Sequence, residues 1–431
     1  MRYIITSAQK NAGVNKNLLQ NIQRFAKEHK VDYIHVIPMA GKYKEEEKFA
    51  PEISELEFVD KLKLNNNLIV YDTKILPQQI DPFRGMASKL SRDYSYILPS
   101  PKIRYKSIAN NSKYPRALMS TGSLTRPNYK TWQAHGKKAQ EQHQYGFVYV
   151  EVVDKTIFQA HQIEATTLGD FHYLTERYYG GKLSHVQPEA LVLGDWHTGD
   201  TCPKVRKKTF EMLKELKPKC VVFHDIFNGH SINHHERGDL LAELRLIEDK
   251  RVGLKQEATQ VFNELKVFAD TFPKIEFFVV RSNHDDFLEK YICGKKFIDD
   301  PHNFLFTCSV IPKIVNDKAV PLKEMLSLIG ELPTNVRFFQ QDESYRVRGV
   351  ELAEHGHLGV NGSRGTPRQY SGHNLRMITG HTHTPELNEN GMTVGTSTKL
   401  RLSYTHGASS WLNAHGILYP NGKYALITLI L

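Results

Sequence analysis

The stretch Leu191-Val192-Leu193-Gly194-Asp195-Trp196-His197 carries the pattern that decides the fold, an apolar run followed at once by a carboxylate and an imidazole. Four more short, mainly apolar runs end in polar loops of this kind, at Val221–Phe223, Phe277–Val280, Val350–Ala353 and Met377-Ile378. Such runs are typical of strands buried on both faces of a sheet. Helical patterns separate some of them, at Val205–Leu216 and from Asp239 to Phe268 with a break at Gly253. The pattern predicts an α/β domain with ligand-binding loops at its strand ends.

The polar residues that follow these runs form five clusters, namely Gly194–His197, His224–Gly229, Ser282–Asp285, Glu354–His357 and Gly380–His383. One such cluster alone is explained as well by a loop cap or a satisfied polar pair. Five together are harder to explain, because each buried polar group without a partner costs ~1–3 kcal/mol. A pair of divalent cations would supply the partners. Carboxylate, imidazole and amide donors suit manganese, iron or zinc better than calcium.

The order Asp-x-His, Asp-x-x-Asn, Asn-His-Asp, His, Gly-His-x-His resembles that of the calcineurin-like metallophosphoesterase superfamily over residues 188–431. The resemblance implies a four-layer α/β/β/α sandwich and two divalent ions, Mn²⁺ with Mg²⁺, Fe or Zn²⁺ as alternatives. It implies ligands for the first ion at Asp195, His197, Asp225 and His383, and for the second at Asp225, Asn283, His355 and His381. Asp225 would bridge the ions, and His284 would be the general acid or stabilise the leaving oxygen. His357 is an alternative to His355.

Within the superfamily, Asp195-Trp196-His197-Thr198-Gly199 resembles the first motif of SbcD-type DNA repair exonucleases. The stretch His355–Tyr370 resembles phage-encoded members, among them first-step-transfer DNases. Two positions depart from the SbcD pattern: His224 replaces the usual Gly, and Asn228 stands where a catalytic His or Asp is common. Asn228 is therefore a candidate catalytic residue, and nearby histidines could compensate for the departure or be ordinary loop residues, at His230, His234 and His235. The short stretch after His383 implies no SbcC-like ATPase partner.

Length and charge point to a second, basic domain. The 431 residues predict two or three domains, and we expect a smaller basic α/β domain at 1–183 before a metallophosphoesterase domain at 184–431. Residues 1–185 hold 27 Lys and Arg against 18 Asp and Glu, so most of the net charge of +10 lies there. From Tyr94 to Gln140 there is no acidic residue, and Pro99–Lys138 reads as long loops. A basic, aromatic-containing stretch of this kind favours DNA as a partner, although solvated loops also carry such charge.

Several basic residues are candidates for binding substrate phosphates. They are Lys102, Arg104 and Lys106 in the basic stretch, and Arg364 and Arg368 after the fourth cluster. A guanidinium matches phosphate geometry, although the two arginines could equally be exposed charges on a glycine-rich loop.

Apolar stretches, the start of the chain and the cysteines indicate the cellular compartment. No stretch approaches the ~20 apolar residues that span a bilayer, and the start has no signal-peptide pattern. The four cysteines form no CxxC pair, which favours a reducing compartment. We therefore expect a cytoplasmic protein, in the host cytoplasm if it is phage-encoded.

These observations favour a metal-dependent DNA nuclease, which would hydrolyse phosphodiester bonds with a water that bridges two metals. The alternative is a phosphatase or phosphodiesterase that acts on a small molecule or phosphoprotein with the same site. A non-enzymatic protein with a relic site fits poorly, because the ligand set is complete. The sequence leaves open endo- or exonuclease action, strand preference and the oligomeric state, a homo-oligomer included.

Overall fold

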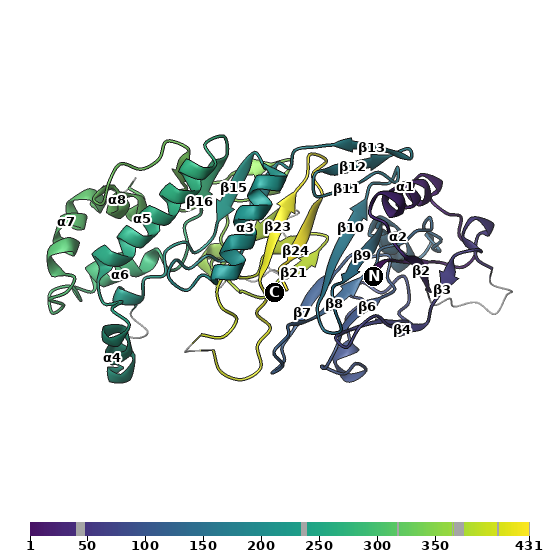
Figure 1. The fold of residues 1–431 in the computed structure, drawn as a ribbon, viewed down its shortest axis with the longest axis horizontal. Helices are drawn as coiled ribbons and strands as arrows, with labels where there is room; N and C mark the ends of the chain where they lie inside the picture. Colours follow the sequence, from purple (N-terminus) through teal and green to yellow (C-terminus); the bar gives the residue numbers. More distant parts are fainter. Residues whose placement is uncertain are drawn as a thin grey trace. The chain divides into compact units, whose positions relative to one another are not determined.

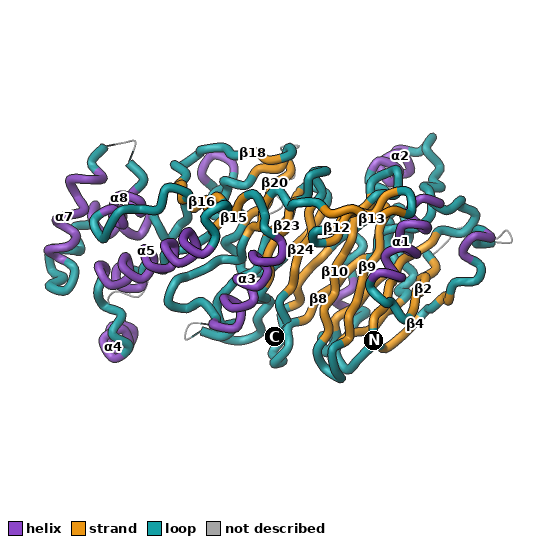
Figure 2. The backbone as a smooth tube through the Cα atoms, turned by 45° about the horizontal axis from the view of Figure 1, so that its top comes forward, coloured by secondary structure: helices purple, strands orange, loops and turns teal. Residues whose placement is uncertain are grey.

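The structure is a computed structural model that describes residues 1–39, 48–233, 239–316, 319–363, 365, 375–402 and 405–430. These residues form eight α-helices and three multi-stranded sheets, which confirms a mixed α/β architecture (Figures 1 and 2). Among the helices in this part of the chain, none is long and apolar enough to cross a membrane.

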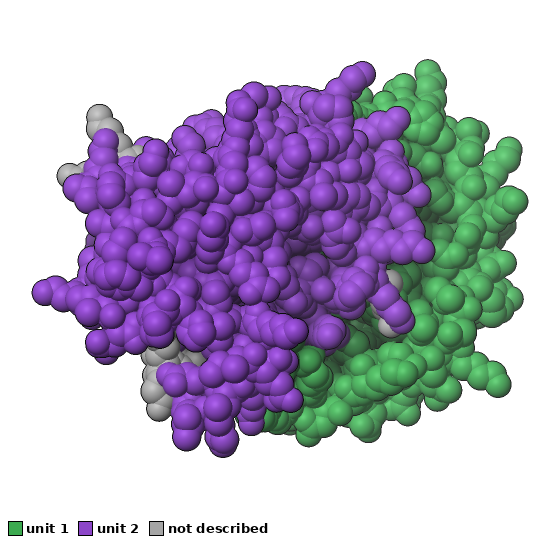
Figure 3. Space-filling model, turned by 60° about the vertical axis from the view of Figure 1, so that its left-hand side comes forward, with its two compact units in different colours: residues 1–188, 384–392, 401–431 green, residues 189–383, 393–400 purple. Residues whose placement is uncertain are grey.

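The chain divides into two compact units, 1–188 with 384–392 and 401–431, and 189–383 with 393–400 (Figure 3). The division expected at 183/184 would place all later residues in the second domain, whereas the compact units place 384–392 and 401–431 with the first. Long-range pairing accounts for the difference. Gln159 Nε2 donates to the carbonyl of Ile430 over 2.9 Å, and Lys423 forms an ion pair with Glu164. These contacts join the C-terminal strands to the first unit.

The second unit contains a parallel sheet in the order β17-β16-β15-β14. Its strands are β14 (Ala190–Val192), β15 (Cys220–Phe223), β16 (Glu276–Val279) and β17 (Val336–Phe338). Three further short strands are β18 (Arg346–Val347), β19 (Val350–Glu351) and β20 (Arg376–Thr379). The helices are α3 (Pro203–Leu216), α4 (Leu240–Glu248), α5 (Leu254–Thr271), α6 (Asp286–Cys293), α7 (Phe304–Ile314) and α8 (Pro321–Ser327). The strands and helices predicted around the five clusters are confirmed, including the break before Leu254.

An aromatic core fixes the sheet of the second unit beneath its helices. The ring of Phe268 on α5 lies 5.2 Å from that of Trp196 and 5.0 Å from that of Phe223, centroid to centroid. Phe210 on α3 lies 4.5 Å from the same ring. Such edge and tilted contacts add to the free energy gained by burying the rings.

The first unit is rich in β-structure. One sheet has the order β13-β12-β11-β10-β9-β1-β2-β3, and a second group of strands follows the order β21-β7-β8-β6-β5-β4. The strands are β1 (Arg2–Ala8), β2 (Tyr33–Pro38), β3 (Glu57–Phe58), β4 (Lys61–Lys63), β5 (Leu68–Tyr71), β6 (Ser95–Leu98), β7 (Tyr105–Ile108), β8 (Arg116–Ser120), β9 (Tyr145–Val152), β10 (Phe158–Ala165), β11 (Phe171–Tyr173), β12 (Glu176–Tyr179), β13 (Lys182–His185), β21 (Glu386–Asn388), β23 (Ala414–Leu418) and β24 (Tyr424–Thr428). β22 (Gly391–Thr393) ends in the second unit. The helices are α1 (Lys16–Glu28) and α2 (Ala134–Glu141).

The β-α-β start predicted from the sequence is confirmed, because β1 and β2 pair in parallel on either side of α1 in the chain. Asn15 caps α1 by accepting a hydrogen bond from Leu18 N over 3.1 Å. Leu18, Ile22 and Phe25 then bury one face of the helix completely.

The prediction of long loops over Pro99–Lys138 is wrong in part, because β7, β8 and the start of α2 lie in this range. The strands are only four and five residues long and hold polar residues inside the fold. Ser107, Arg116 and Ser120 are all buried, so the alternation of apolar and polar residues that signals a strand is lost.

Candidate metal centre

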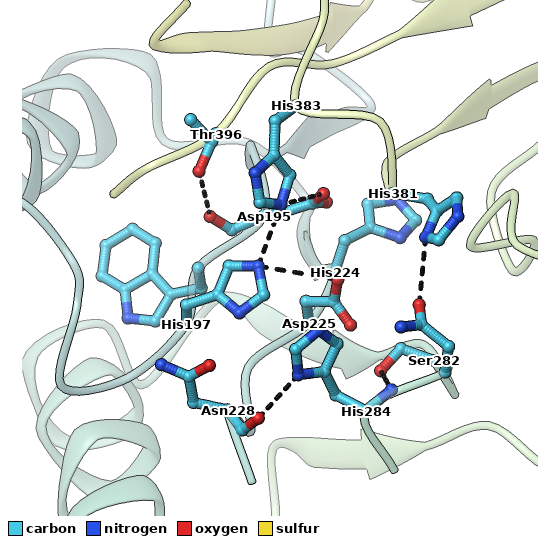
Figure 4. Close-up of polar contacts among 12 residues, drawn as sticks. Asp195, His197, His224, Asp225, Asn228, Ser282, His284, His381, His383 and Thr396 are labelled. Atoms are coloured by element: carbon cyan, nitrogen blue, oxygen red, sulfur yellow. Dashed lines mark hydrogen bonds and ion pairs between the residues drawn. The ribbon is translucent and has the colours of Figure 1, made fainter. Parts of the chain in front are cut away.

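Five loops of the second unit bring the predicted clusters together. β14, β15 and β16 run parallel, so the loops that carry Asp195, Asp225 and Asn283 leave the sheet at one edge. β19 and β20 are also parallel, and the loops after them carry His355 and His381. Figure 4 shows side chains from four of these loops turned toward one another.

Backbone hydrogen bonds hold the first two loops in register. His197 N donates to the carbonyl of Asp225 over 2.7 Å, and Trp196 N donates to that of His224 over 2.9 Å. The Trp196 side chain is fully buried, and its Nε1 donates to Glu264 over 3.2 Å. The indole therefore anchors the segment between the two candidate ligands that flank it.

Four candidate ligands have left-handed backbone conformations. The φ angles are 45° at His197, 46° at Asp225, 76° at His381 and 57° at His383. A residue other than glycine rarely adopts this conformation, and it costs about 1–2 kcal/mol relative to the right-handed region. Strain of this kind is concentrated at functional sites, where the surrounding structure holds the residue in place.

The first cluster contains Asp195, His197, Asp225 and His383. Each offers one ligand atom, and these atoms all lie within 4.8 Å of one another. His383 Nε2 lies 3.2 Å from Asp195 Oδ2 and 3.0 Å from His197 Nε2. All four residues are buried. This cluster could hold a metal ion.

The second cluster contains Asp225, His355 and His381 within the same distance limit. His355 Nε2 lies 3.2 Å from Asp225 Oδ2. The amide oxygen of Asn283 lies 3.2 Å from His355 Nε2 and 3.0 Å from His381 Nδ1, so it joins this group. Asp225 belongs to both clusters, as a bridging carboxylate would.

The charge balance of the site fits cations. Asp195 Oδ1 and Asp225 Oδ1 are buried, and neither has a hydrogen-bond partner among the described residues. Burial by itself raises the pKa of the Asp225 carboxyl, but His355 and His284 outweigh it and hold that pKa well below its usual range. Buried anionic oxygens without partners are costly. Carboxylates, imidazoles and an amide oxygen are the donors that borderline divalent metals accept.

Two imidazoles respond to this charge in opposite ways. Burial lowers the pKa of His197 to about 3, so this imidazole is neutral, as a metal ligand must be. Burial also acts to lower the pKa of His355, but the carboxylates of Asp225 and Asp195 outweigh it and raise the value to about 8. The cluster thus draws a proton onto His355, which is the response expected of a site with excess negative charge.

Gly380 lies against the first cluster with no room for a side chain. A Cβ there would lie 2.1 Å from Asp195 Oδ1 and 2.9 Å from His224 Cβ. We expect Gly380→Ala to displace the Asp195 carboxylate and to lower the free energy of unfolding by about 1–3 kcal/mol, as overpacking does. Metal content by mass spectrometry and denaturant unfolding measure both effects. Gly13→Ala is the matched control, because a Cβ at Gly13 has nothing within 4 Å. Unchanged metal content in Gly380→Ala would contradict this geometry.

His284 lies at the edge of the first cluster, with its ring 4.8 Å from that of His197. Its Nδ1 lies 2.6 Å from the carbonyl oxygen of Asn228. A carbonyl can only accept, so Nδ1 carries the proton and donates it, and Nε2 is the nitrogen available for other chemistry. His284 is partly exposed, unlike the buried carboxylates beside it.

Asn228, the candidate catalytic residue, contacts its neighbours through both its backbone and its side chain. Its carbonyl orients His284, while its side-chain Nδ2 donates to Asp200 Oδ2 over 2.6 Å. Asp200 also lies 2.8 Å from His230 Nε2 and accepts from Arg251 over 2.9 Å. The side-chain amide nitrogen of Asn228 is therefore engaged with Asp200. Sequence reasoning missed Asp200, for which the only local signal is an acid three residues after His197.

The remaining histidines near the site have defined places. His224 is fully buried, with Nδ1 3.3 Å from His355 Nδ1. His357 lies next to the second cluster, with its ring 5.4 Å from that of His355, but it is His355 that shares the second cluster with Asp225. His234 and His235 lie outside the described residues.

The structure corrects two of the five candidate phosphate-binding residues. Lys102 is fully buried, and its Nζ donates to the carbonyl of Pro77 over 3.0 Å. Arg104 is buried and forms an ion pair with Glu389. Neither cation can contact a phosphate at the surface, whereas Lys106 is exposed. Arg364 and Arg368 lie outside the described residues.

Comparisons with known proteins give one sequence relative. Protein A1 of Escherichia phage T5 is 27% identical over an alignment of 468 residues, which covers 99% of this chain and 81% of that protein. No family model matches the chain. One solved structure at 9% identity covers 56% of this chain and 99% of its own, with a TM-score of 0.31, which is too low to identify a shared fold.

Proposed function

We propose that this protein is a metal-dependent DNA nuclease that hydrolyses phosphodiester bonds. The observation that carries the proposal is the pair of buried Asp and His clusters that share Asp225. A shared carboxylate is the arrangement that two-metal phosphoesterases use. The similarity of the motifs to metallophosphoesterases supports the same chemistry on a four-layer α/β/β/α sandwich.

In this proposal Asp195, His197 and His383 hold one ion, Asn283, His355 and His381 hold the other, and Asp225 bridges them. Bound divalent ions, of which Mn²⁺ is our first choice, would act as Lewis acids on a phosphate oxygen and acidify a water between them. Hydrogen bonds between the loops that carry the ligands keep those ligands oriented. The backbone ladder from Trp196 and His197 fixes two of them before substrate binds.

His284 then acts on the leaving oxygen. Its Nδ1–H is committed to the Asn228 carbonyl, so the imidazole must carry a second proton, on Nε2, to donate a proton or a hydrogen bond to the leaving oxygen as the ester bond breaks. The Asp200–Asn228 contact holds the loop that bears this carbonyl. Asp200 is thus a positioning residue for His284.

DNA is favoured over a small phosphate ester by the charge of the first unit. Exposed lysines in this unit would neutralise the phosphates of a polyanion such as DNA. A phosphatase that acts on a small ester has no use for them. The similarity to a bacteriophage protein supports the proposal that this protein acts in the cytoplasm of a host cell. A phosphatase or phosphodiesterase with the same metals is the alternative that the experiment must separate.

The test is incubation of the purified protein and Mn²⁺ with supercoiled plasmid DNA, next to p-nitrophenyl phosphate. We expect the plasmid to be cut and cutting to stop when EDTA is added. Hydrolysis of p-nitrophenyl phosphate without any cleavage of plasmid or linear DNA would overturn the nuclease proposal in favour of the phosphatase.

A further inference from the structure

Glu257 is a buried carboxylic acid in the first turn of α5, the helix labelled in Figure 2, and only 7% of the residue is exposed. The start of this helix is fixed, because Leu254 N donates to Asn303 Oδ1 over 2.6 Å. Burial raises the pKa of the Glu257 carboxyl, and hydrogen bonds from Ser231 act to lower it. Burying a carboxylate is costly unless donors replace its water, so the groups that donate to Glu257 indicate its role.

In the described part of the chain, the hydrogen bonds to the Glu257 side chain come from one loop segment, at His230 and Ser231. His230 N donates to Oε1 and Ser231 N donates to Oε2, each over 3.0 Å. The Ser231 hydroxyl also donates to Oε2. Each carboxylate oxygen thus accepts from a different backbone N–H group. Two such contacts fix the orientation of the segment as well as its distance from α5.

The segment that Glu257 holds lies directly after the carbonyl that orients His284. The carbonyl oxygen of Asn228 lies 2.6 Å from His284 Nδ1 (Figure 4). Gly229 is the one residue between this carbonyl and the two amides, and its φ is 71°. A Cβ at Gly229 would lie 3.0 Å from the ring of Phe287, which itself lies 4.7 Å from the ring of His284. A shift of the two amides would therefore move the Asn228 carbonyl as well.

We propose that Glu257 is a positioning residue for His284. By holding the N–H groups of residues 230 and 231, it sets the place of the Asn228 carbonyl, and that carbonyl sets the direction of His284 Nε2. Asp200 holds the side chains of the same segment, through Asn228 and His230, so two carboxylates fix it through different groups. The value of this position for catalysis rests on the proposed function, whereas the position itself can be measured without metal or DNA.

The position of the ring is tested by NMR of the full-length protein in EDTA, with its histidines labelled with nitrogen-15. The His284 Nδ1–H group donates to a carbonyl and should give a proton signal, which His284→Ala identifies by its loss. Glu257→Gln puts an NH₂ group where one oxygen accepts from an N–H group, so one of the two backbone contacts is lost. We expect the His284 signal to shift or broaden in this variant. An unchanged His284 signal would overturn the inference, whether or not the protein is a nuclease.

The effect on catalysis is tested through the leaving group. Glu257→Gln should lower kcat for DNA about 10- to 100-fold, because a small misplacement of a catalytic group is costly, and it should leave KM nearly unchanged. The loss should be much smaller on bis-p-nitrophenyl phosphate, whose leaving group needs no proton. In a His284→Ala background, Glu257→Gln should cause no further loss. A further loss in that background, or an equal loss on both substrates, would overturn the inference, because Glu257 would then support only the fold.

Glu189→Gln is the matched control. It changes another buried carboxylate of the second unit, which pairs with two cations before β14, at the end of that strand away from Asp195. This variant should lower the temperature of unfolding without any dependence of the rate on the leaving group. If the unchanged protein hydrolyses neither substrate while Glu257→Gln still moves the His284 signal, the proposed function fails and the positioning of the ring stands.

Discussion

Asp225→Asn should abolish hydrolysis and reduce bound Mn²⁺ to less than one ion per chain. The substitution keeps the shape of the side chain but removes the charge that both clusters share. In the unchanged protein, Mn²⁺ at about 100 times its Kd should add about 2.7 kcal/mol to the free energy of unfolding. The variant should lose most of this gain, because neither ion retains its bridging ligand. Metal content by mass spectrometry and thermal unfolding with and without Mn²⁺ measure both effects independently of activity.

The control for Asp225→Asn is Asp170→Asn, which makes the same change at a partly buried carboxylate paired with Arg177 in the first unit. It should leave metal content and hydrolysis unchanged. Two ions bound to Asp225→Asn with full turnover would refute the shared-ligand assignment.

His284→Ala should keep both metals and lose about 10²- to 10⁴-fold in the rate of DNA hydrolysis, the usual contribution of a general acid. The reason lies in the leaving group. An alkoxide leaving from DNA needs a proton or hydrogen bond, whereas p-nitrophenolate is already a stable anion. The loss should therefore be much smaller on bis-p-nitrophenyl phosphate, which rates on both substrates and metal content will test.

His302→Ala, at an exposed histidine of the same unit, is the control for His284→Ala and should behave like the unchanged protein. If His284→Ala slows both substrates equally while both metals stay bound, the proton-donor role is wrong. His284 would then act only through the shape of the site.

The sequence was most informative where the relevant pattern is local. The break between α4 and α5 follows from Gly253, which begins α5 as its N-cap residue. The apolar runs before Asp195, Asp225 and His381 each become a strand, because a few consecutive β-forming residues with a polar end suffice to define one. The order of the polar clusters was also readable, since parallel strands bring their carboxyl ends to one edge.

Side-chain environment was not readable, because it depends on residues far away in the chain. Lys102 and Arg104 look like surface cations in the sequence, yet Pro77 and Glu389 are the partners that they contact. Glu389 lies far from Arg104 in the sequence, so no local pattern signals the ion pair between them. The opposite holds for Trp132, whose exposure appears only once the surrounding loop is folded.

The sequence by itself determined the types of candidate ligand and the strands that precede them, because residue identity and short apolar runs are local properties. The tertiary structure placed Asp225, the expected bridge, in both clusters, and it alone decided that Asn228 turns its amide to Asp200 and that His197 has a left-handed backbone. It also decided that the last strands belong to the first unit. The physical reason is that these features arise from hydrogen bonds and packing between loops distant in sequence, whose energies exceed the local backbone preferences they override.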